Sequence, residues 1–346
     1  MNYLEYLLKK TYKATKGIKK GKPASYIPAL AQVDPNIYGI SIVDCSGNLY
    51  SIGDHKKTVA IESIGKLFTF AMALKKHGMN ALFNKIGMHG SFLPFNSVIA
   101  AQLSKSHTIN PFLNQGAMAT TSLLYQKNHK RFKSSVLNNM REYANRNLTL
   151  GKRVYASESA TNQHNKALAY LLKSYNRFYG NVEASVDVYT AQGSLKVSSD
   201  DLAIMGSVFA NGGTHPITKK KFLTPGETSY AMRTLLPEGL YEYSDRWIIK
   251  AGRPAKSGVG GGLVIVIPGM CAIGIVSPPL DRHGNSVRGI AAGIKLVNKL
   301  SLHPFNNLEW RCEHIHALTR WKKTHRRRLR KRKTTRKRHI TSRKKR

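Results

Sequence analysis

Cysteine is scarce in this chain, which contains only Cys45, Cys271 and Cys312 among its 346 residues. The three cysteines are widely spaced and form no C-x-x-C pair, which argues against both a disulfide framework and a zinc site. Reduced thiols are typical of a cytoplasmic compartment. We therefore expect a cytoplasmic protein with no metal site.

Long apolar runs are also missing. Residues 1–20 contain none that a signal peptide or a membrane anchor would need. The most apolar stretch, residues 263–275, is interrupted by Pro268 and Gly269, whereas a helix that crosses a bilayer needs about 20 consecutive apolar residues. We expect no membrane association, and we interpret residues 263–275 as two buried strands around a turn.

Acidic residues are few, because 18 Asp and Glu stand against 56 Lys and Arg and the formal net charge is +38. Residues 320–346 contain 17 of these cations and no acid. Such a basic tail can hold nucleic acid or another polyanion through counterion release. No aromatic residue follows Trp321, which argues against base stacking and favours nonspecific contact. The alternative is a solvated, disordered tail without a partner.

The pattern of apolar residues predicts strands near both ends of the chain and helices between them. Strand-like runs occupy residues 38–44, 48–52, 247–251, 263–267 and 271–277. Residues from about 80 to 210 have mostly helical spacing with polar loops. This order predicts an α+β fold, in which one antiparallel sheet is built from both ends, is flanked by helices and carries a helical subdomain.

These patterns divide the chain into three segments. Residues 1–22 form a basic, helical lead-in, residues 23–303 form the main domain, and residues 304–346 form the basic tail. The helical subdomain falls within the main domain, at about 80–210. Because a chain of this length can bury a full core, we expect one domain with an insertion rather than two independent domains.

Ser63 and Lys66 lie three residues apart where a helix is predicted to begin, because apolar residues recur at helical spacing from Ile64 to Leu74 and stop at Gly78. A serine hydroxyl becomes a useful nucleophile when a base removes its proton, and a lysine can be that base if its neutral form is favoured. The first N–H groups of a helix have no partner within it, so they can face an oxyanion. An S-x-x-K motif alone is common by chance.

A second motif, Lys256-Ser257-Gly258, precedes a glycine run at 260–262 and the apolar residues 263–267. S-x-x-K followed by K-T-G marks penicillin-recognising serine enzymes, and Lys-Ser-Gly is a close variant. A tight glycine turn before a buried strand would explain the glycines but not the pairing with the first motif. A β-lactam-interacting serine hydrolase is therefore one interpretation of the pair.

Further motifs follow in order between Tyr26 and Leu296, over about four fifths of the chain. They are Tyr26-Ile27-Pro28, Glu62-Ser63-Ile64-Gly65-Lys66, Asn110-Pro111-Phe112-Leu113-Asn114-Gln115-Gly116, Ser157-Glu158 with Asn165, Asp187-Val188-Tyr189, Ala210-Asn211-Gly212-Gly213, Gly239-Leu240-Tyr241 and Ser277-Pro278-Pro279. With them the sequence resembles the serine-dependent glutaminases of the bacterial and kidney type. That family has a β-lactamase/transpeptidase-like fold, so the resemblance implies this fold for residues 23–303.

The resemblance implies hydrolysis of L-glutamine to L-glutamate and ammonia through a glutamyl ester, without a metal or an organic cofactor. Ser63 would be the nucleophile, Lys66 its base and Tyr241 a proton relay to the leaving ammonia. Val259 would offer a backbone N–H to the oxyanion. The residues implied to bind the substrate are Tyr26, Ser63, Asn114, Glu158, Asn165, Tyr189, Tyr241 and Val259. The family also implies a homo-oligomer, either a dimer or a tetramer.

These residue types also have ordinary structural uses. Asn114 and Asn165 could cap helices, a position that asparagine often occupies. The tyrosines could be packing residues with a satisfied hydroxyl group, as most buried tyrosines are. Glu158 could pair with a surface lysine. The order of the motifs, rather than the residue types, favours the functional interpretation.

Four departures from the family pattern lie close to the predicted site. Glu62 stands where the family usually has glutamine, and a negative charge there could hold Lys66 protonated and slow the base step. Gly65 replaces a serine, which loosens the helix by about 0.5 to 1 kcal/mol. Gln115 replaces a small alanine, and Gly193-Ser194 replaces the residues that usually follow the tyrosine motif, so the pocket could differ in shape. Reduced activity or an altered substrate would leave the basic tail as the functional part, with the globular domain as its scaffold.

Overall fold

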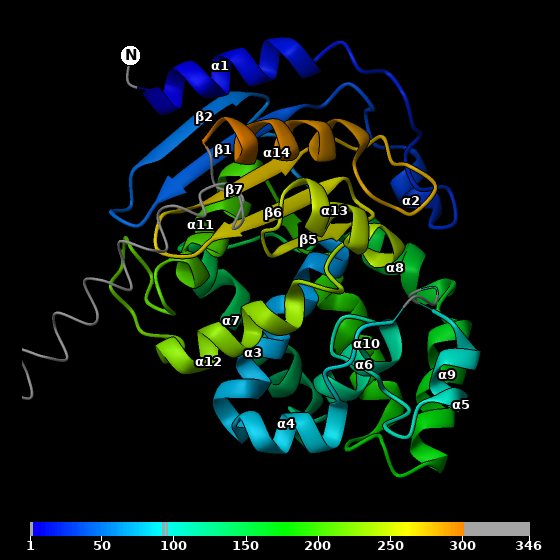
Figure 1. Ribbon diagram of the computed structural model, residues 1–346. Helices are drawn as coiled ribbons and strands as arrows, with labels where there is room; N and C mark the ends of the chain where they lie inside the picture. Colours follow the sequence, from blue (N-terminus) through cyan, green and yellow to red (C-terminus); the bar gives the residue numbers. More distant parts are fainter. Residues whose placement is uncertain (1–2, 92–93, 95, 301–346) are drawn as a thin grey trace, which may run out of the picture. The chain divides into compact units, whose positions relative to one another are not determined.

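The computed structural model describes residues 3–300 except 92, 93 and 95, and Figure 1 shows how their helices and strands are arranged. The predicted basic tail, residues 304–346, lies outside the described residues. Within the described part of the chain, no helix is both long and apolar enough to cross a membrane.

A five-stranded antiparallel sheet is built from both ends of the chain, in the order β2-β1-β7-β6-β5. Its strands are β1 (Gly39–Asp44), β2 (Leu49–Gly53), β5 (Ala255–Gly258), β6 (Gly262–Ile267) and β7 (Cys271–Val276). β1 pairs with β7, so that Ile42 lies opposite Ile273. This pairing joins the early hairpin to the late one, and it confirms the predicted sheet.

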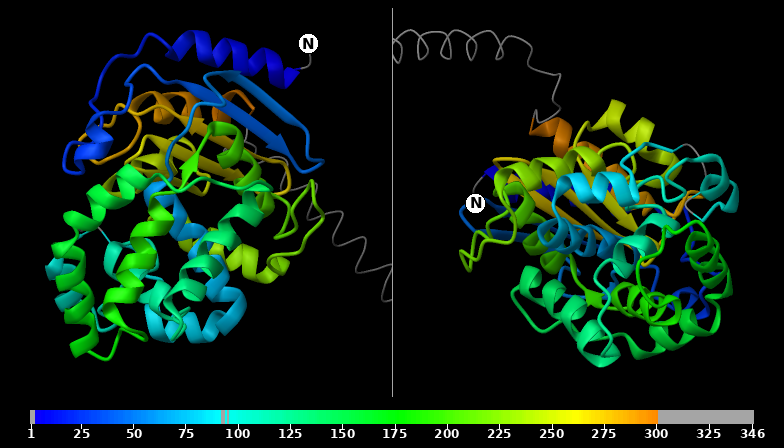
Figure 2. Two further views of the ribbon diagram at one scale, coloured as in Figure 1. Left: turned by 180° about the vertical axis from the view of Figure 1, so that it is seen from behind. Right: turned by 90° about the horizontal axis from the view of Figure 1, so that it is seen from below.

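Successive side chains along a strand point to opposite faces of the sheet, and both faces are buried. In β6, Leu263, Ile265 and Ile267 pack into a core shared with α1 (Tyr3–Thr15) and α14 (Val287–Lys299), whereas Val264 and Val266 pack into the core of the helical side. Figures 1 and 2 show α1 and α14 on one side of the sheet and most other helices on the other side. A strand buried on both faces is expected to be apolar throughout, as β6 is.

The remaining elements, apart from α2, lie in the chain between β2 and β5. In chain order they are α2 (Pro28–Ala31), β3 (Val59–Ala60), the 3₁₀ turn η1 (Glu62–Ile64), α3 (Gly65–His77), α4 (Met79–Ile86), α5 (Val98–Leu103), α6 (Asn114–Ser122), α7 (His129–Ala144), α8 (Lys152–Ala160), α9 (Gln163–Ser174), α10 (Val182–Gly193), β4 (Lys196–Val197), α11 (Ser199–Ala210), α12 (Pro225–Leu235), the 3₁₀ turn η2 (Tyr241–Tyr243) and α13 (Ser244–Lys250). Helices dominate the range from 80 to 210, but α11 packs against β1, β6 and β7.

The predicted strand at residues 247–251 is wrong, because this segment belongs to α13 and its last residue caps that helix. Ser244, Trp247 and Ala251 are buried while Ile249 is exposed. Buried positions three and four residues apart are typical of a helix, so the run of apolar residues there misled the strand prediction. The opposite error concerns Lys256-Ser257-Gly258, which was not among the predicted strands and lies in β5.

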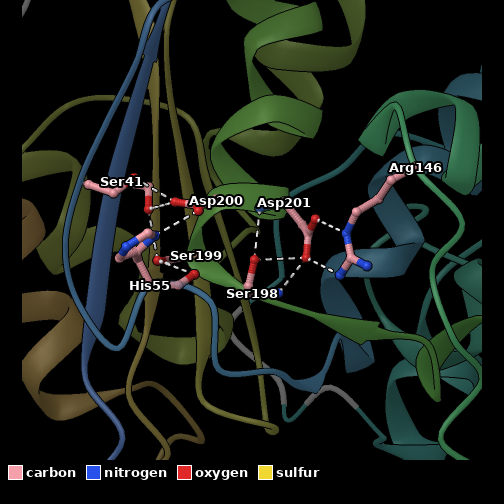
Figure 3. A network of polar contacts seen from close by, with 8 residues as sticks. Ser41, His55, Arg146, Ser198, Ser199, Asp200 and Asp201 are labelled. Carbon is pink, nitrogen blue, oxygen red and sulfur yellow. Dashed lines mark hydrogen bonds and ion pairs between the residues drawn. The ribbon is translucent and has the colours of Figure 1, made fainter.

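The start of α11 ties the sheet to the helical side through two acids, as Figure 3 shows. Asp200 accepts hydrogen bonds from the hydroxyl groups of Ser41 and Ser51, each at 2.6 Å, and lies 2.7 Å from Nδ1 of His55. Asp201 closes a capping box with Ser198 and receives two hydrogen bonds from Arg146.

Replacing Asp201 by asparagine is expected to lower the free energy of unfolding by about 2 kcal/mol, because a neutral amide loses the two-point match to Arg146 and weakens the cap. Urea denaturation measures this change. The control Glu142→Gln removes an acid whose pair with Lys220 is half-exposed, and it should change the free energy by less than about 0.5 kcal/mol. Equal stability of Asp201→Asn and the parent would contradict this role.

Candidate active site

One cavity brings together all the residues that the sequence singled out for the site. Besides the elements around Ser63, its wall includes side chains from α6, α8, α9, α10 and the turn between β5 and β6. The predicted residues found there are Tyr26, Ser63, Lys66, Asn114, Glu158, Asn165, Tyr189, Tyr241 and Val259. Tyr26 is 58% exposed, which places it at the rim of the cavity.

The turn that carries Ser63 is fixed by backbone pairing on its N-terminal side. β3 pairs with β4, and the N–H group of Ile61 donates to the carbonyl of Leu195 at 2.8 Å. Glu62 then adopts a left-handed backbone conformation with φ of 50°, which is unusual for a residue with a side chain. Ser63 lies in η1, directly before α3, and that helix ends at Gly78 as predicted.

Lys66 is buried in α3, with only 2% of its surface exposed. Its Nζ atom donates to the carbonyl oxygen of Phe112 at 3.0 Å and to Oδ1 of Asn114 at 2.7 Å. Burial lowers the pKa of Lys66 to about 7, although the charges of Glu158 and Glu62 oppose the shift. A lysine with this pKa has a substantial neutral population near pH 7 and can accept a proton. Burial therefore lowers the pKa of Lys66 more than the charge of Glu62 raises it, so Glu62 does not keep Lys66 fully protonated as was expected.

Asn110 holds the loop that presents these two acceptors to Lys66. Its Oδ1 atom accepts hydrogen bonds from the N–H groups of Phe112 and Leu113, and its Nδ2 atom donates to the carbonyl of His89 at 2.8 Å. A Cβ atom at Gly116 would lie 1.8 Å from the carbonyl oxygen of Asn110, so only glycine fits at that position. The motif that begins at Asn110 thus shapes this loop as well as supplying Asn114 to the wall of the cavity.

Two asparagines and a tyrosine form a polar cluster inside the cavity. Nδ2 of Asn114 donates to Oδ1 of Asn165 at 3.1 Å, and the hydroxyl group of Tyr189 donates to Oδ1 of Asn114 at 3.1 Å. The N-cap residues of α6 and α9 are Leu113 and Asn162. The capping alternative for Asn114 and Asn165 is therefore wrong, and both amides are available to the cavity.

Two acids, Glu62 and Glu158, also line the cavity. Burial raises the pKa of Glu158, and the charge of Lys66 opposes the shift. Burial also raises the pKa of Glu62, the charge of Glu158 adds to the effect, and Lys66 again opposes it. Within the described residues, Glu158 forms no ion pair, so it does not neutralise a surface lysine.

Tyr241 reaches the cavity from η2, where its φ of 55° is again left-handed. Burial raises the pKa of its hydroxyl group, and a hydrogen bond with Ser63 opposes the shift. The fully buried Lys256 supports Tyr241 from behind, because its Nζ atom lies 4.3 Å from the ring centroid and donates to the carbonyls of Gly239 and Ser257. Lys256 does not line the cavity, so the K-S-G motif contributes a positioning residue.

Gly258 allows β5 to pack directly against the Ser63 turn. A Cβ atom at this position would lie 2.5 Å from the carbonyl oxygen of Ile61, closer than real Cβ contacts come. Val259 follows immediately and lines the cavity. The glycines of this segment therefore serve close approach as well as the turn that was expected from them.

Several residues of the wall were not predicted. Asn162 and His164 lie within the segment quoted for Asn165, so sequence position could have suggested them. Gln192 and Gly193 end α10. Gly193 was noted in the sequence as a departure from the family pattern, whereas no sequence signal pointed to Gln192. The additional lining residues are Ile27, Asn96, Thr161, Asn162, His164, Gln192 and Gly193. Gln115 is buried but does not line the cavity.

A buried lysine one helical turn after a serine, with Lys-Ser-Gly on a neighbouring strand, matches the motif pairing of the penicillin-recognising serine enzymes. The antiparallel sheet flanked by helices is the β-lactamase-like arrangement that was predicted.

Known proteins narrow this class to one family. A family model described as Glutaminase matches residues 21–305. The Glutaminase of Colwellia psychrerythraea strain 34H is 43% identical over 302 residues, which are 87% of this chain and 97% of that protein. Glutaminase 1 of Escherichia coli strain K12 is 39% identical over 88% of this chain and 98% of that protein.

Solved structures agree with the sequence relatives. The probable glutaminase ybaS has a TM-score of 0.86 and 38% identity over 88% of this chain and 99% of that chain. A probable glutaminase from Bacillus subtilis, complexed with 6-diazo-5-oxo-L-norleucine, has a TM-score of 0.79 and 26% identity over 88% of this chain and 98% of that chain. The chain belongs to the glutaminase family and is an amidohydrolase. None of these relatives favours the β-lactam interpretation.

Replacing Gly258 by alanine is expected to lower kcat/KM of the enzyme by about 100-fold, because the added methyl group displaces the Ser63 turn. Steady-state kinetics on the folded variant measures the effect. The control Gly226→Ala places its Cβ atom 4.0 Å from the nearest side-chain atom at the exposed start of α12, and it should leave kcat/KM unchanged. Full activity of Gly258→Ala would contradict the close-approach argument.

Proposed function

We propose that this enzyme hydrolyses L-glutamine to L-glutamate and ammonia through an ester on Ser63. The observation that carries the proposal is the buried amine of Lys66, whose pKa is lowered to about 7 and which lines the same polar cavity as Ser63. Membership of the glutaminase family supports the substrate.

The first half of the reaction transfers the acyl group to the enzyme. Neutral Lys66 accepts the proton of Ser63, and Oγ attacks the side-chain amide carbon of glutamine. The backbone N–H groups of Ser63 and Val259 stabilise the negative charge that develops on the amide oxygen. Tyr241, which hydrogen-bonds Ser63, relays the proton from Lys66 to the nitrogen, so that the C–N bond breaks and ammonia leaves.

The second half releases glutamate. A water molecule gives a proton to neutral Lys66 and attacks the ester carbon, and the proton returns to Oγ of Ser63 as the ester bond breaks. The serine and its base supply both nucleophile activation and proton transfer, so the steps need no cofactor.

Polar groups around the nucleophile match the two charges of a free amino acid. Glu158 suits the ammonium group, because carboxylates accept charge-assisted hydrogen bonds. Asn114, Asn165 and Tyr189 offer amide and phenol groups for the carboxylate. Tyr26 covers the entrance. These assignments place the side-chain amide of glutamine toward Ser63.

We also propose that the enzyme is a cytoplasmic homo-oligomer, a dimer or tetramer, and that residues 320–346 hold polyanions without sequence preference. The free thiols of Cys45 and Cys271 support a cytoplasmic location. Membership of the glutaminase family supports the homo-oligomer. The 17 cations of residues 320–346 support contact with polyanions. A purely monomeric species in analytical ultracentrifugation would contradict the assembly.

Replacing Ser63 by alanine is expected to reduce coupled release of ammonia and glutamate by at least about 10⁴-fold, because no other group then forms the ester. The measurement is a coupled assay of both products from L-glutamine. Ser174→Ala changes an exposed serine at the end of α9 and should keep full activity. Turnover retained by Ser63→Ala would refute the proposed mechanism.

Deleting residues 320–346 is expected to abolish retention on RNA at low salt while leaving kcat/KM for glutamine unchanged, because those residues carry the densest positive charge. Filter binding over a salt series measures the retention. Unchanged RNA binding by the shortened protein would refute contact through this tail.

A further inference from the structure

Two carboxyl groups border one small space inside the cavity. A Cβ atom at Gly193 would lie 3.8 Å from Oε2 of Glu62 and 3.9 Å from Oε2 of Glu158. The two acids come from distant segments, since Glu62 lies in η1 and Glu158 in α8. Because Gly193 has no side chain, the space between the acids is left to the cavity that all three residues line.

Neither carboxyl group is fully satisfied by the protein. Oε1 of Glu62 and Oε2 of Glu158 are buried without a hydrogen-bond partner, and Glu62 is only 7% exposed. Neither acid forms an ion pair among the described residues. The nearby amine of Lys66 instead donates to Phe112 and Asn114. Buried carboxyl oxygens without donors are costly, so this part of the cavity favours a ligand with several N–H groups.

The backbone of Glu62 is consistent with a functional position. Its φ of 50° lies in the left-handed region, where a residue with a side chain is disfavoured by about 1 to 2 kcal/mol. Such conformations concentrate at ligand sites, where surrounding structure maintains them. Here the pairing of Ile61 with Leu195 on one side and the start of α3 on the other hold Glu62 in place.

We infer that Glu62 joins Glu158 in holding the α-ammonium group of the substrate, and that this pair of acids selects amides with a free primary ammonium group. The inference rests on the proposed hydrolysis of glutamine and adds a specificity-determining residue to it. An ammonium group has three N–H donors and can bridge two carboxylates. N-acylated glutamine, and glutamine at an internal or C-terminal position of a peptide, lack this charge and would leave both acids unpaired.

Ligand binding should then release a proton near pH 7. The charged groups facing Glu62 are Glu158 from α8 and Lys66 from α3, and the phenols of Tyr241 and Tyr26 lie nearby. Burial raises the pKa of both acids without ligand, that of Glu158 to about 7, so the protonated form of Glu158 is populated near pH 7. An ammonium ion between them favours the charged forms, which lowers their pKa values and expels protons.

The test is calorimetric binding of L-glutamine to Ser63→Ala, which cannot turn the ligand over by the proposed route. Titrations at pH 7 in buffers with different ionisation enthalpies give both Kd and the number of protons released. Adding Glu62→Gln is expected to raise Kd at least tenfold and to reduce proton release by at least half. Glutaramic acid, which is glutamine without its amino group, should bind equally to both proteins.

Two further variants sharpen the comparison. Glu142→Gln in the same Ser63→Ala background removes a half-exposed acid on α7 that does not line the cavity, and it should change neither quantity. Glu62→Asp keeps the charge but shortens its reach, and should give an intermediate Kd. Thermal melts establish that each variant is folded before binding is compared.

Unchanged Kd and proton release in the folded Glu62→Gln variant would overturn the inference while leaving the proposed function intact. An equal loss of affinity for glutaramic acid would overturn it too, since the effect would not depend on the ammonium group. Failure of Ser63→Ala itself to bind L-glutamine would instead overturn the proposed function, and the inference with it. In active enzyme, a higher kcat with unchanged KM for Glu62→Gln would show that Glu62 acts on Lys66, not on the substrate.

Discussion

The amine of Lys66 is removed from water and is held by two oxygen acceptors, and the chemistry of the cavity depends on that arrangement. Loss of hydration favours the neutral amine, while the nearby acids favour the charged one. The balance lowers the pKa to about 7. A more exposed lysine would stay protonated near neutral pH and could not accept the proton of Ser63. A buried lysine without nearby acids would have a still lower pKa and would therefore be a weaker base toward Ser63.

The surrounding fold maintains this balance by bringing distant segments into close contact. Asn110 shapes the loop that provides the acceptors, and Gly258 lets β5 approach the Ser63 turn. Lys256 packs behind Tyr241 from the same strand. Glu62 and Tyr241 both have left-handed backbone conformations, which cost stability locally and persist because neighbouring structure determines them. The sheet and its two cores supply that stability.

Much of the fold was accessible from the sequence, because β1, β2, β6 and β7 are apolar segments with clear turns between them. The end of α3 at Gly78 also followed from local chemistry, since glycine readily ends a helix. The segment that contains Trp247 was misread because its apolar residues are contiguous, whereas only tertiary packing decides which of them are buried. β5 was missed because lysine, serine and glycine are poor strand formers and their pairing with β6 is long-range.

That the motif residues would lie together was predictable because the motifs occur in a fixed order, but their environments were not. Nothing local to Lys66 indicates that Phe112 and Asn114 will receive its hydrogen bonds. The role of Gly193 likewise depends on two acids that are far away in sequence. The central claim is that free enzyme contains a partly neutral Lys66 near pH 7. NMR titration of ¹³Cε-labelled lysine, assigned through Lys66→Arg, tests it directly. We expect the Lys66 amine to titrate with a midpoint of about 7, and a midpoint at the ordinary lysine value of 10.5 would contradict the proposed base.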